Sequence, residues 1–214
     1  MGGRGASLRP AGGTDGLLRF QNNALGDIVP DRGGLKQAIG KKGKPYSIDN
    51  ALKNVNPFYN REYSEFSANC QRCVVAYELR RRGYNVTALP VYKDDRLPVV
   101  NSFGNGIWQG AFKGAKNVRV GATTPRKVQS NLEAKMKSYG NGARAIVRIP
   151  GHVFNCENVN GKIRYVDAQI GKRYTSNDVF GRLTKEQLKT VRIIRTDNLK
   201  ISDRARKSVK LLKE

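Results

Sequence analysis

The stretch Asn69-Cys70-Gln71-Arg72-Cys73-Val74-Val75 places two thiols at the predicted start of a helix. Cys70 and Cys73 recur with the apolar residues at helical spacing, and Asn69 is of a residue type that caps helix N-termini. Arg80-Arg81-Arg82-Gly83 predicts the other end of the helix, with cations at the negative end of its dipole and a glycine after the last turn. The first turn of this helix therefore carries Cys70.

A thiol in the first turn of a helix has the chemistry of a nucleophile. It faces backbone N–H groups without an intrahelical partner and the positive end of the helix dipole, and both favour the thiolate. The same N–H groups can stabilise an oxyanion on an attacked carbonyl. Cys73 lies one turn deeper, so we expect Cys70 to be the nucleophile and Cys73 a packed thiol. The alternative is that both are ordinary core cysteines.

His152, the one histidine of the chain, is the predicted proton carrier. It follows the break Pro150-Gly151 and opens a predicted strand over residues 152–157. The Asn-Gly turn in residues 158–161 predicts a hairpin, which brings residues 162–169 back beside that strand. This register places Asp167 or Gln169 near His152. A cysteine nucleophile needs such a set: an imidazole to exchange protons and an acid or amide to orient it.

Two other uses of the cysteines are disfavoured by spacing. Cys70, Cys73, His152 and Cys156 supply the inventory of a Cys₃His zinc site. Residues four apart on a strand, however, lie about 13 Å apart, too far for His152 and Cys156 to share one ion. A thioredoxin-like role is disfavoured because no βαβ pattern leads into the CxxC motif. We therefore expect no metal and no cofactor, and the odd number of cysteines, 3, argues against a disulfide framework.

The remaining chain divides into three predicted parts: a flexible, basic, glycine-rich arm (1–45), a catalytic domain (46–197) and a basic C-terminal helix that begins at Ser202-Asp203 (198–214). Within the domain the patterns predict helices near 48–55 and 124–140, and strands over 85–89, 143–149 and 191–195. Trp108 and Phe112 are the expected anchors of the turn-rich stretch 91–122.

Charge is the strongest compositional signal, with 40 Lys and Arg against 17 Asp and Glu and a net charge of +23. Such a field attracts nucleic acid, anionic lipid or acidic protein surfaces without specificity. No stretch has the apolar length of a membrane span, and the N-terminus lacks the apolar run of a secretory signal. We expect a cytoplasmic site of action, in a host or target cell, for a protein that is delivered there or phage-encoded.

The order Asn-Cys…His…Asp-x-Gln resembles the papain-fold toxin domains of bacterial polymorphic toxin systems, which are glutamine deamidases or relatives of cysteine peptidases. Similar modules occur in phage head-associated proteins. The likeness extends over roughly residues 54–171 and rests on these matches: Asn56-Pro57, Asn69-Cys70-Gln71-Arg72-Cys73, Ala88-Leu89-Pro90, Gly151-His152 and Val166-Asp167-Ala168-Gln169.

The resemblance implies an α+β, papain-like fold in which the nucleophile helix packs on an antiparallel sheet. It implies that Cys70, His152 and Asp167 are catalytic, and we add Gln169, Asn69, Asn56 and Cys73 as supporting candidates. The implied function is a protein glutamine deamidase that acts as a toxin or effector on a protein substrate. An immunity or inhibitor protein is a further candidate partner.

Two alternatives stay open at this point. A papain-like cysteine peptidase would use the same attack on a carbonyl carbon and would differ only in its cleft. A non-enzymatic, basic phage structural or nucleic-acid-binding protein would need the charge but not the thiol.

Overall fold

The computed structural model describes residues 34–60, 64–91 and 107–212 of the chain. Most of the predicted arm therefore lies outside the described residues, and so does much of the stretch 91–122. Residues 33–214 cluster into one compact unit.

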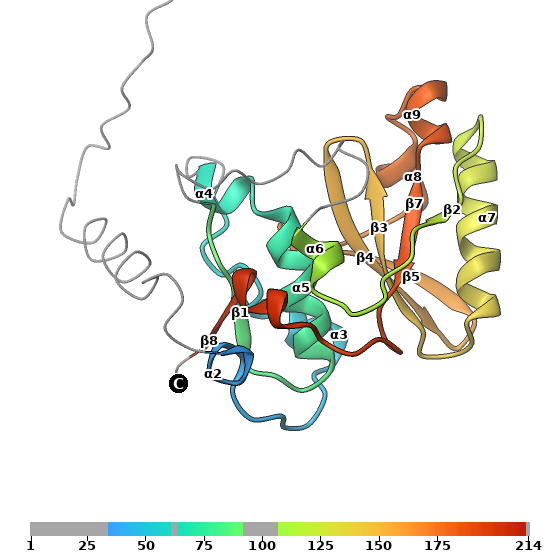
Figure 1. Cartoon of the computed structure of the whole chain (residues 1–214). Helices are drawn as coiled ribbons and strands as arrows, with labels where there is room; N and C mark the ends of the chain where they lie inside the picture. The colour runs from blue at the N-terminus through green and yellow to red at the C-terminus, as the bar shows by residue number, and fades with distance from the viewer. Residues whose placement is uncertain (1–33, 61–63, 92–106, 213–214) are drawn as a thin grey trace, which may run out of the picture. The chain divides into compact units, whose positions relative to one another are not determined.

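Six antiparallel strands form the central sheet, in the order β2-β7-β3-β4-β5-β6 (Figure 1). The strands are β2 (Val118–Arg119), β3 (Arg144–Ile149), β4 (His152–Val159), β5 (Lys162–Asp167), β6 (Lys172–Tyr174) and β7 (Arg192–Arg195). The predicted strands over 143–149, 152–157, 162–169 and 191–195 are thus confirmed to within two residues at each end. The short outer strands β2 and β6 were not predicted, because runs of two or three residues carry too little pattern.

The hairpin that joins β4 to β5 is confirmed in detail. Asn160 and Gly161 have φ angles of 51° and 79°, the positive values that a two-residue type I′ turn requires. Val159 pairs with Lys162, and the register continues to Asn155 opposite Val166. The turn residues therefore determine which residue of β5 meets the start of β4.

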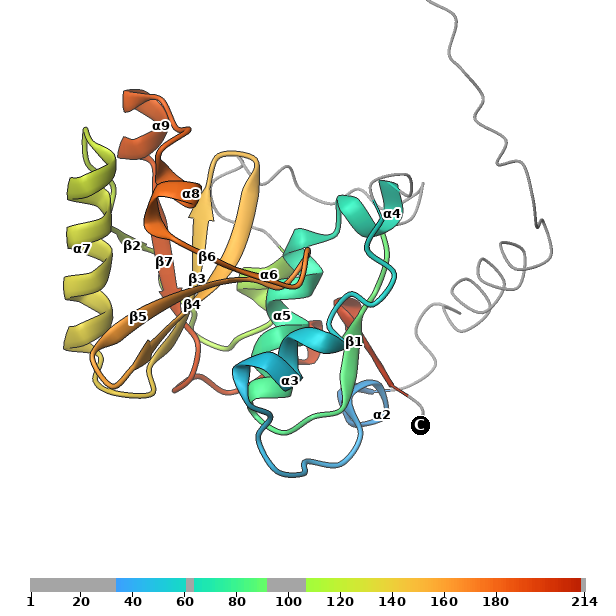
Figure 2. The same cartoon turned by 180° about the vertical axis from the view of Figure 1, so that it is seen from behind.

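Helices cover both faces of the sheet (Figures 1 and 2). On one face lies α5 (Cys70–Arg81), and on the other α7 (Pro125–Ser138) packs Val128, Leu132 and Met136 into a separate core cluster. Thr124 caps α7 as its position before Pro125 predicts. The other helices are short: α2 (Leu35–Ile39), α3 (Ile48–Lys53), α4 (Ser64–Ser67), α6 (Ile107–Gly110), α8 (Ser176–Phe180), α9 (Lys185–Lys189) and the 3₁₀ helix η1 (Asp203–Lys207).

The helix α5 is more deeply buried than its sequence pattern predicts, because every residue from Cys70 to Arg80 is buried. The sheet covers one side, and α3, α6 and β1 (Val86–Ala88) cover others. Gly83 ends the helix as predicted: its N–H donates to Arg80 O (2.8 Å) and the N–H of Tyr84 donates to Leu79 O (3.1 Å). A helix enclosed on all sides cannot turn or slide without disturbing the core.

Two of the predicted boundaries are wrong. In place of one continuous helix, the described residues 198–212 contain the short 3₁₀ helix η1 and then β8 (Val209–Leu211), which pairs with β1 in a second, two-stranded sheet. The predicted arm also includes α2, whose Ile39 lies in the same core cluster as Val209. Both segments belong to the compact unit because α2 packs on η1 and β8, and β8 packs on β1 and α5, partners far away in the sequence.

Trp108 and Phe112 are each 2% exposed and anchor the chain after α6, as predicted. None of the helices in the described part of the chain is sufficiently long and apolar to span a membrane.

Candidate active site

The structure brings Cys70, His152 and Asp167 together. Cys70 is the first residue of α5, His152 is the first residue of β4, and Asp167 is the last residue of β5. His152 Nε2 lies 2.7 Å from Asp167 Oδ2, and the side chain of Cys70 is the second neighbour whose interaction raises the pKa of the imidazole. Since Nε2 is engaged by Asp167, Nδ1 is the ring nitrogen left for proton exchange with the thiol. The three side chains thus form a continuous thiol–imidazole–carboxylate chain.

The β4–β5 hairpin produces this contact. Asn155 pairs with Val166, so that Asp167 is the next residue toward the end of the sheet where His152 begins its strand. Gly151, with φ 77°, turns the chain immediately before His152. Between Asp167 and Gln169, the two residues that the sequence leaves open as partners of the imidazole, the structure has Asp167 at hydrogen-bond distance.

The charge of the imidazole depends on these neighbours. Burial lowers the pKa of His152, but hydrogen bonds and charge interactions with Asp167 and Cys70 outweigh it and raise the pKa from 6.5 to about 10. At neutral pH the imidazolium is therefore favoured. An imidazolium beside a thiol is an arrangement that can deliver a proton to a leaving group.

Asp167 is itself held on both oxygens. Its Oδ1 accepts a hydrogen bond from the backbone N–H of Gln169 at 2.9 Å, and its side chain is buried. Tyr174 on β6 adds a third interaction: burial first, and then the charge of Asp167 and a hydrogen bond to it, raise the pKa of Tyr174 to about 12. Tyr174 is not among the residues predicted for the site. The register in which Asp167 opposes Lys172 brings it close, but a three-residue strand gives no pattern from which to predict that register.

The four supporting candidates also converge, in a buried amide cluster behind Cys70. Asn56 and Asn69 form a reciprocal pair, with Nδ2–Oδ1 distances of 3.3 and 3.1 Å. Asn56 Nδ2 donates to the backbone oxygen of Gln169 (2.9 Å), and Asn69 Oδ1 accepts from Gln169 Nε2 (3.4 Å) and from the Cys73 thiol (3.2 Å). The cluster joins the start of α5 to the segment that follows Asp167.

This cluster corrects the prediction for Asn69. Asn69 occupies the N-cap position of α5, but its side chain makes no capping hydrogen bond to the helix. Its side-chain nitrogen donates instead to Asn56 Oδ1 and to Leu89 O (3.2 Å). Its side-chain oxygen accepts from Gln169 and Cys73, as described above. The Asn69 side chain therefore does not cap the first N–H groups of α5. These groups point out of the N-terminal end of the helix, where Cys70 is the first residue.

The other two thiols lie in different surroundings. Cys73 is fully buried, and its pKa is raised by burial first and then by the charges of Cys70 and Asp167. Cys156 lies in the middle of β4 in the core cluster that contains Phe154 and Phe180, and burial raises its pKa as well. Cys70 retains 5% exposure at the helix start. Within residues 34–60, 64–91 and 107–212, no three His, Cys, Asp or Glu side chains converge as ligands for one metal ion.

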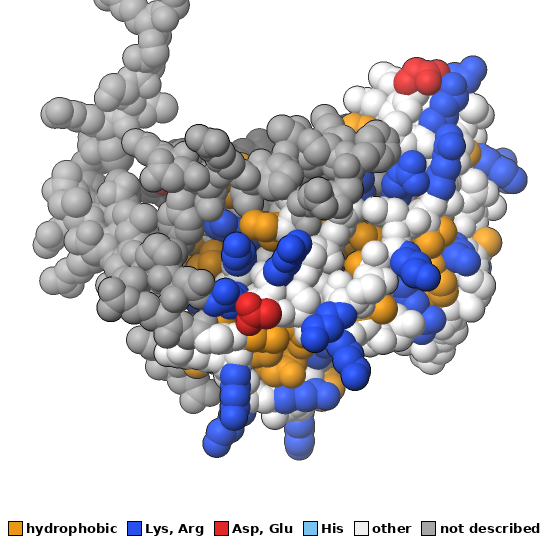
Figure 3. Space-filling view, viewed as in Figure 1, with side chains coloured by type: hydrophobic (Ala, Val, Ile, Leu, Met, Phe, Trp, Pro, Cys, Tyr) orange, Lys and Arg blue, Asp and Glu red, His pale blue; other side chains and the backbone are white. Residues whose placement is uncertain are grey.

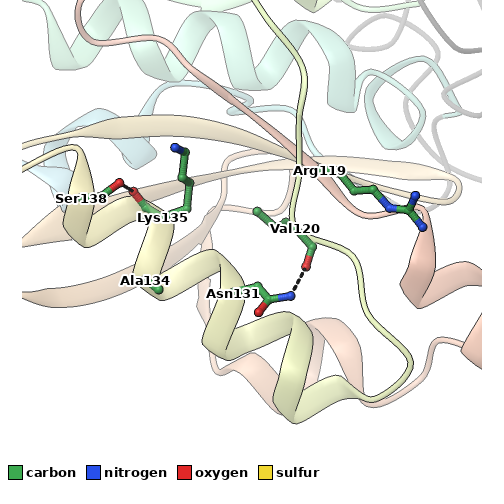
Figure 4. Close-up of a pocket in the computed structure, with 6 residues that line it drawn as sticks. All are labelled: Arg119, Val120, Asn131, Ala134, Lys135 and Ser138. Atoms are coloured by element: carbon green, nitrogen blue, oxygen red, sulfur yellow. Dashed lines mark hydrogen bonds between the residues drawn. The ribbon is translucent and has the colours of Figure 1, made fainter.

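A hollow of about 410 Å³ lies elsewhere on the described surface, between β2 and α7 (Figure 4). It is lined by Arg119, Val120, Asn131, Ala134, Lys135 and Ser138. Asn131 closes one side by donating to Val120 O at 3.2 Å. None of these residues belongs to the group around Cys70, and the lining contains neither a cysteine nor a histidine.

Comparison with known families agrees with this geometry. Residues 68–172 match the model of a family described as papain fold toxin 1, glutamine deamidase. The matched segment, which belongs to that family, contains Cys70, His152 and Asp167, and it confirms the resemblance and the papain-like α+β fold class. No curated protein and no solved structure matches the chain.

Proposed function

From the membership of residues 68–172 in the papain-fold glutamine deamidase family, we propose that this protein is a cysteine-dependent hydrolase that deamidates glutamine side chains of a protein. The observation that carries the proposal is the contact chain Cys70–His152–Asp167, with His152 Nε2 at 2.7 Å from the carboxylate. In this role Cys70 is the nucleophile, His152 moves protons and Asp167 orients and charges the imidazole.

The acylation step breaks the carbon–nitrogen bond of the carboxamide. Cys70 Sγ attacks the carbonyl carbon, and the oxyanion that forms lies toward the N–H groups of the first turn of α5. The imidazolium of His152 gives its proton to the departing nitrogen, so that ammonia leaves and a thioester remains. Loss of the thiolate removes one of the charges that raise the pKa of His152, which favours this proton transfer.

The deacylation step returns the site to its starting state. The now neutral imidazole takes a proton from water, whose oxygen attacks the thioester carbon. The carbon–sulfur bond breaks, glutamate is released, and the thiolate again faces an imidazolium. The net reaction converts a carboxamide and water into a carboxylate and ammonium.

The partner that we propose is a protein substrate with an acidic surface. The enzyme would meet it in the cytoplasm of a target cell and act there as a toxin or effector. Lys and Arg side chains spread over the visible face of the molecule and outnumber acidic ones (Figure 3). Several acids are also enclosed: Glu78, Glu157 and Asp167 are at most 2% exposed. Three arginines of the described residues, Arg72, Arg80 and Arg148, are buried as well, so the exposed charge keeps the basic balance of the composition. An inhibitor that covers the site would need complementary acidic residues.

The test is the change in intact mass of candidate protein targets incubated with the purified chain. Deamidation adds about 1 Da per converted glutamine and leaves the target in one piece. Fragments would show that the site admits a peptide backbone and would support a peptidase instead.

Cys70→Ala and His152→Ala must each abolish the mass change. Both variants must still unfold at nearly the same denaturant concentration as the wild type, so that the loss of activity is not a loss of fold. Cys73→Ala is the matched control, because it removes a neighbouring thiol that is fully buried and must leave a measurable reaction. A target modified equally by Cys70→Ala would refute the proposal.

A further inference from the structure

Beyond the reacting residues, α5 and β4 carry a second set of contacts, at their far ends. Glu157 on β4 accepts from Arg81 on α5 through both oxygens (2.7 and 2.8 Å) and from the Tyr77 hydroxyl at 2.6 Å. The Glu157 side chain is 2% exposed and that of Arg81 is 19% exposed. We refer to Tyr77, Arg81 and Glu157 as the clamp. The mechanism above makes no use of them.

The clamp occupies the same two elements as the nucleophile and the histidine. Cys70 and Arg81 are 11 residues apart on α5, which corresponds to about 16 Å at the rise of a helix. His152 and Glu157 are five residues apart on β4, which corresponds to about 17 Å at the rise of a strand. The helix and the strand therefore run side by side over matching lengths, with Cys70–His152 at one end and Arg81–Glu157 at the other.

A third contact lies between these ends. Asn155 Nδ2 on β4 donates to the backbone oxygen of Val74 on α5 at 3.2 Å. The helix and the strand thus meet at three successive points. A shift of α5 along β4, or a rotation about its own axis, would break the directional bonds of the clamp and would also move Cys70 relative to His152.

Stability alone does not account for a buried acid at this place. Removing a carboxylate and a guanidinium from water costs several kcal/mol per ion, and apolar side chains of similar volume are often as stabilising. What a bidentate Arg–carboxylate pair adds is direction, because two parallel hydrogen bonds fix both distance and angle. Apolar contacts are non-directional, so they fix the angle and register of α5 on β4 less sharply than these hydrogen bonds do.

We propose that Tyr77, Arg81 and Glu157 are positioning residues that hold α5 in the register on β4 at which Cys70 meets His152. This proposal rests on the proposed function of Cys70 and His152. It goes beyond it in assigning a catalytic consequence to residues at the opposite end of the helix.

The experiment measures the rate at which iodoacetamide alkylates Cys70 in the full-length chain between pH 6 and 9, with Cys70 identified by peptide mass. In the wild type Cys70 should react faster than Cys73 and Cys156 throughout this range, because His152 lies beside its sulfur and the other two thiols are fully buried. Glu157→Gln removes the charge with little change of shape, and Arg81→Lys keeps the charge but loses the bidentate geometry. We expect the Cys70 rate to fall about tenfold or more below the wild-type rate in Glu157→Gln, and by less in Arg81→Lys, across this pH range.

The matched control is Arg80→Met, at the neighbouring position of the same helix. Arg80 is 1% exposed and donates to Ala51 O (3.0 Å) and Val86 O (3.1 Å), so that it joins α5 to other elements than β4. We expect this variant to lose stability and to keep the wild-type Cys70 rate. Denaturant unfolding of each variant separates stability from reactivity.

Each outcome decides between the two proposals. If wild-type Cys70 reacts no faster than Cys73 and Cys156, the proposed function fails and the positioning role fails with it. If Cys70 reacts fast and both clamp variants keep the wild-type rates, the positioning proposal alone is overturned. The same holds if Arg80→Met lowers the Cys70 rate as much as they do. Should Glu157→Gln not fold, Arg81→Lys decides.

Discussion

At the scale of single residues, the charge of His152 is the quantity on which the chemistry depends. Asp167 and Cys70 raise its pKa to about 10 against the effect of burial. The folded protein therefore binds this proton more tightly than the unfolded chain, whose histidine has a pKa near 6.5. The stabilisation that results is fully present below about pH 6.5 and is lost as the pH rises through about 10.

Asp167→Asn tests this dependence. Loss of the carboxylate charge should lower the pKa of His152, so that NMR titration of the ring finds its midpoint below that of the wild type. Stability should then be lost at a lower pH than in the wild type, and turnover of a substrate should fall by about 10²–10⁴-fold. An unchanged titration midpoint would show that Asp167 does not control the imidazole.

The residues of the site were predictable to different extents. Cys70, His152 and Asp167 follow from local signals: a thiol at a helix start, a single histidine and an Asn-Gly hairpin that determines a register. The behaviour of Asn69 could not be predicted, because its capping tendency is overridden by Asn56 and Gln169, which only the fold brings near. Tyr174 lacked any signal for the same reason.

At the scale of elements, the C-terminal end of α5 depends on one glycine. Gly83 has φ 100°, and a Cβ at this position would lie 2.3 Å from the backbone oxygen of Gly43. Gly140 has a similar φ of 94°, but a Cβ there would meet nothing within 4 Å. The two positions therefore share the cost of a left-handed backbone and differ in the available space.

Gly83→Ala should consequently lower the free energy of unfolding by about 1–3 kcal/mol more than Gly140→Ala. Denaturant titration of both variants measures this difference. Equal losses would mean that Gly43 and Gly83 can move apart without cost.

Elements formed by neighbouring residues were predictable, and those formed by distant partners were not. The helix α7 and the β4–β5 hairpin carry their own capping and turn residues, and both are confirmed. The strand β8 lies in a basic stretch that reads as a helix, and it becomes a strand because β1, more than a hundred residues earlier, offers an open edge. The packing of α2 against the same region is likewise a property of the fold alone.

At the scale of the whole molecule, the net charge of +23 is spread over the surface while several acids are enclosed. We expect binding to DNA of unrelated sequences to weaken at least about tenfold between 50 and 200 mM salt, because non-specific contacts release counterions. Cys70→Ala should bind equally well, as measured by fluorescence anisotropy. Tight, sequence-selective binding that survives 200 mM salt would favour a nucleic-acid-binding function over the enzyme.

The pairing of β8 with β1 beside α2 has a consequence for how this unit can be rearranged. Gly40 lies so close to Leu211 that a Cβ added to Gly40 would be 2.7 Å from the Leu211 side chain. Residues near the two limits of the described chain are therefore neighbours in space. A short peptide could bridge them, and new termini could be opened at the exposed Asn160-Gly161 turn. Such a circular permutant would have its elements in a different order along the chain. It would keep the thiol, the imidazole and the carboxylate in the same place, because the packing of the elements does not depend on that order.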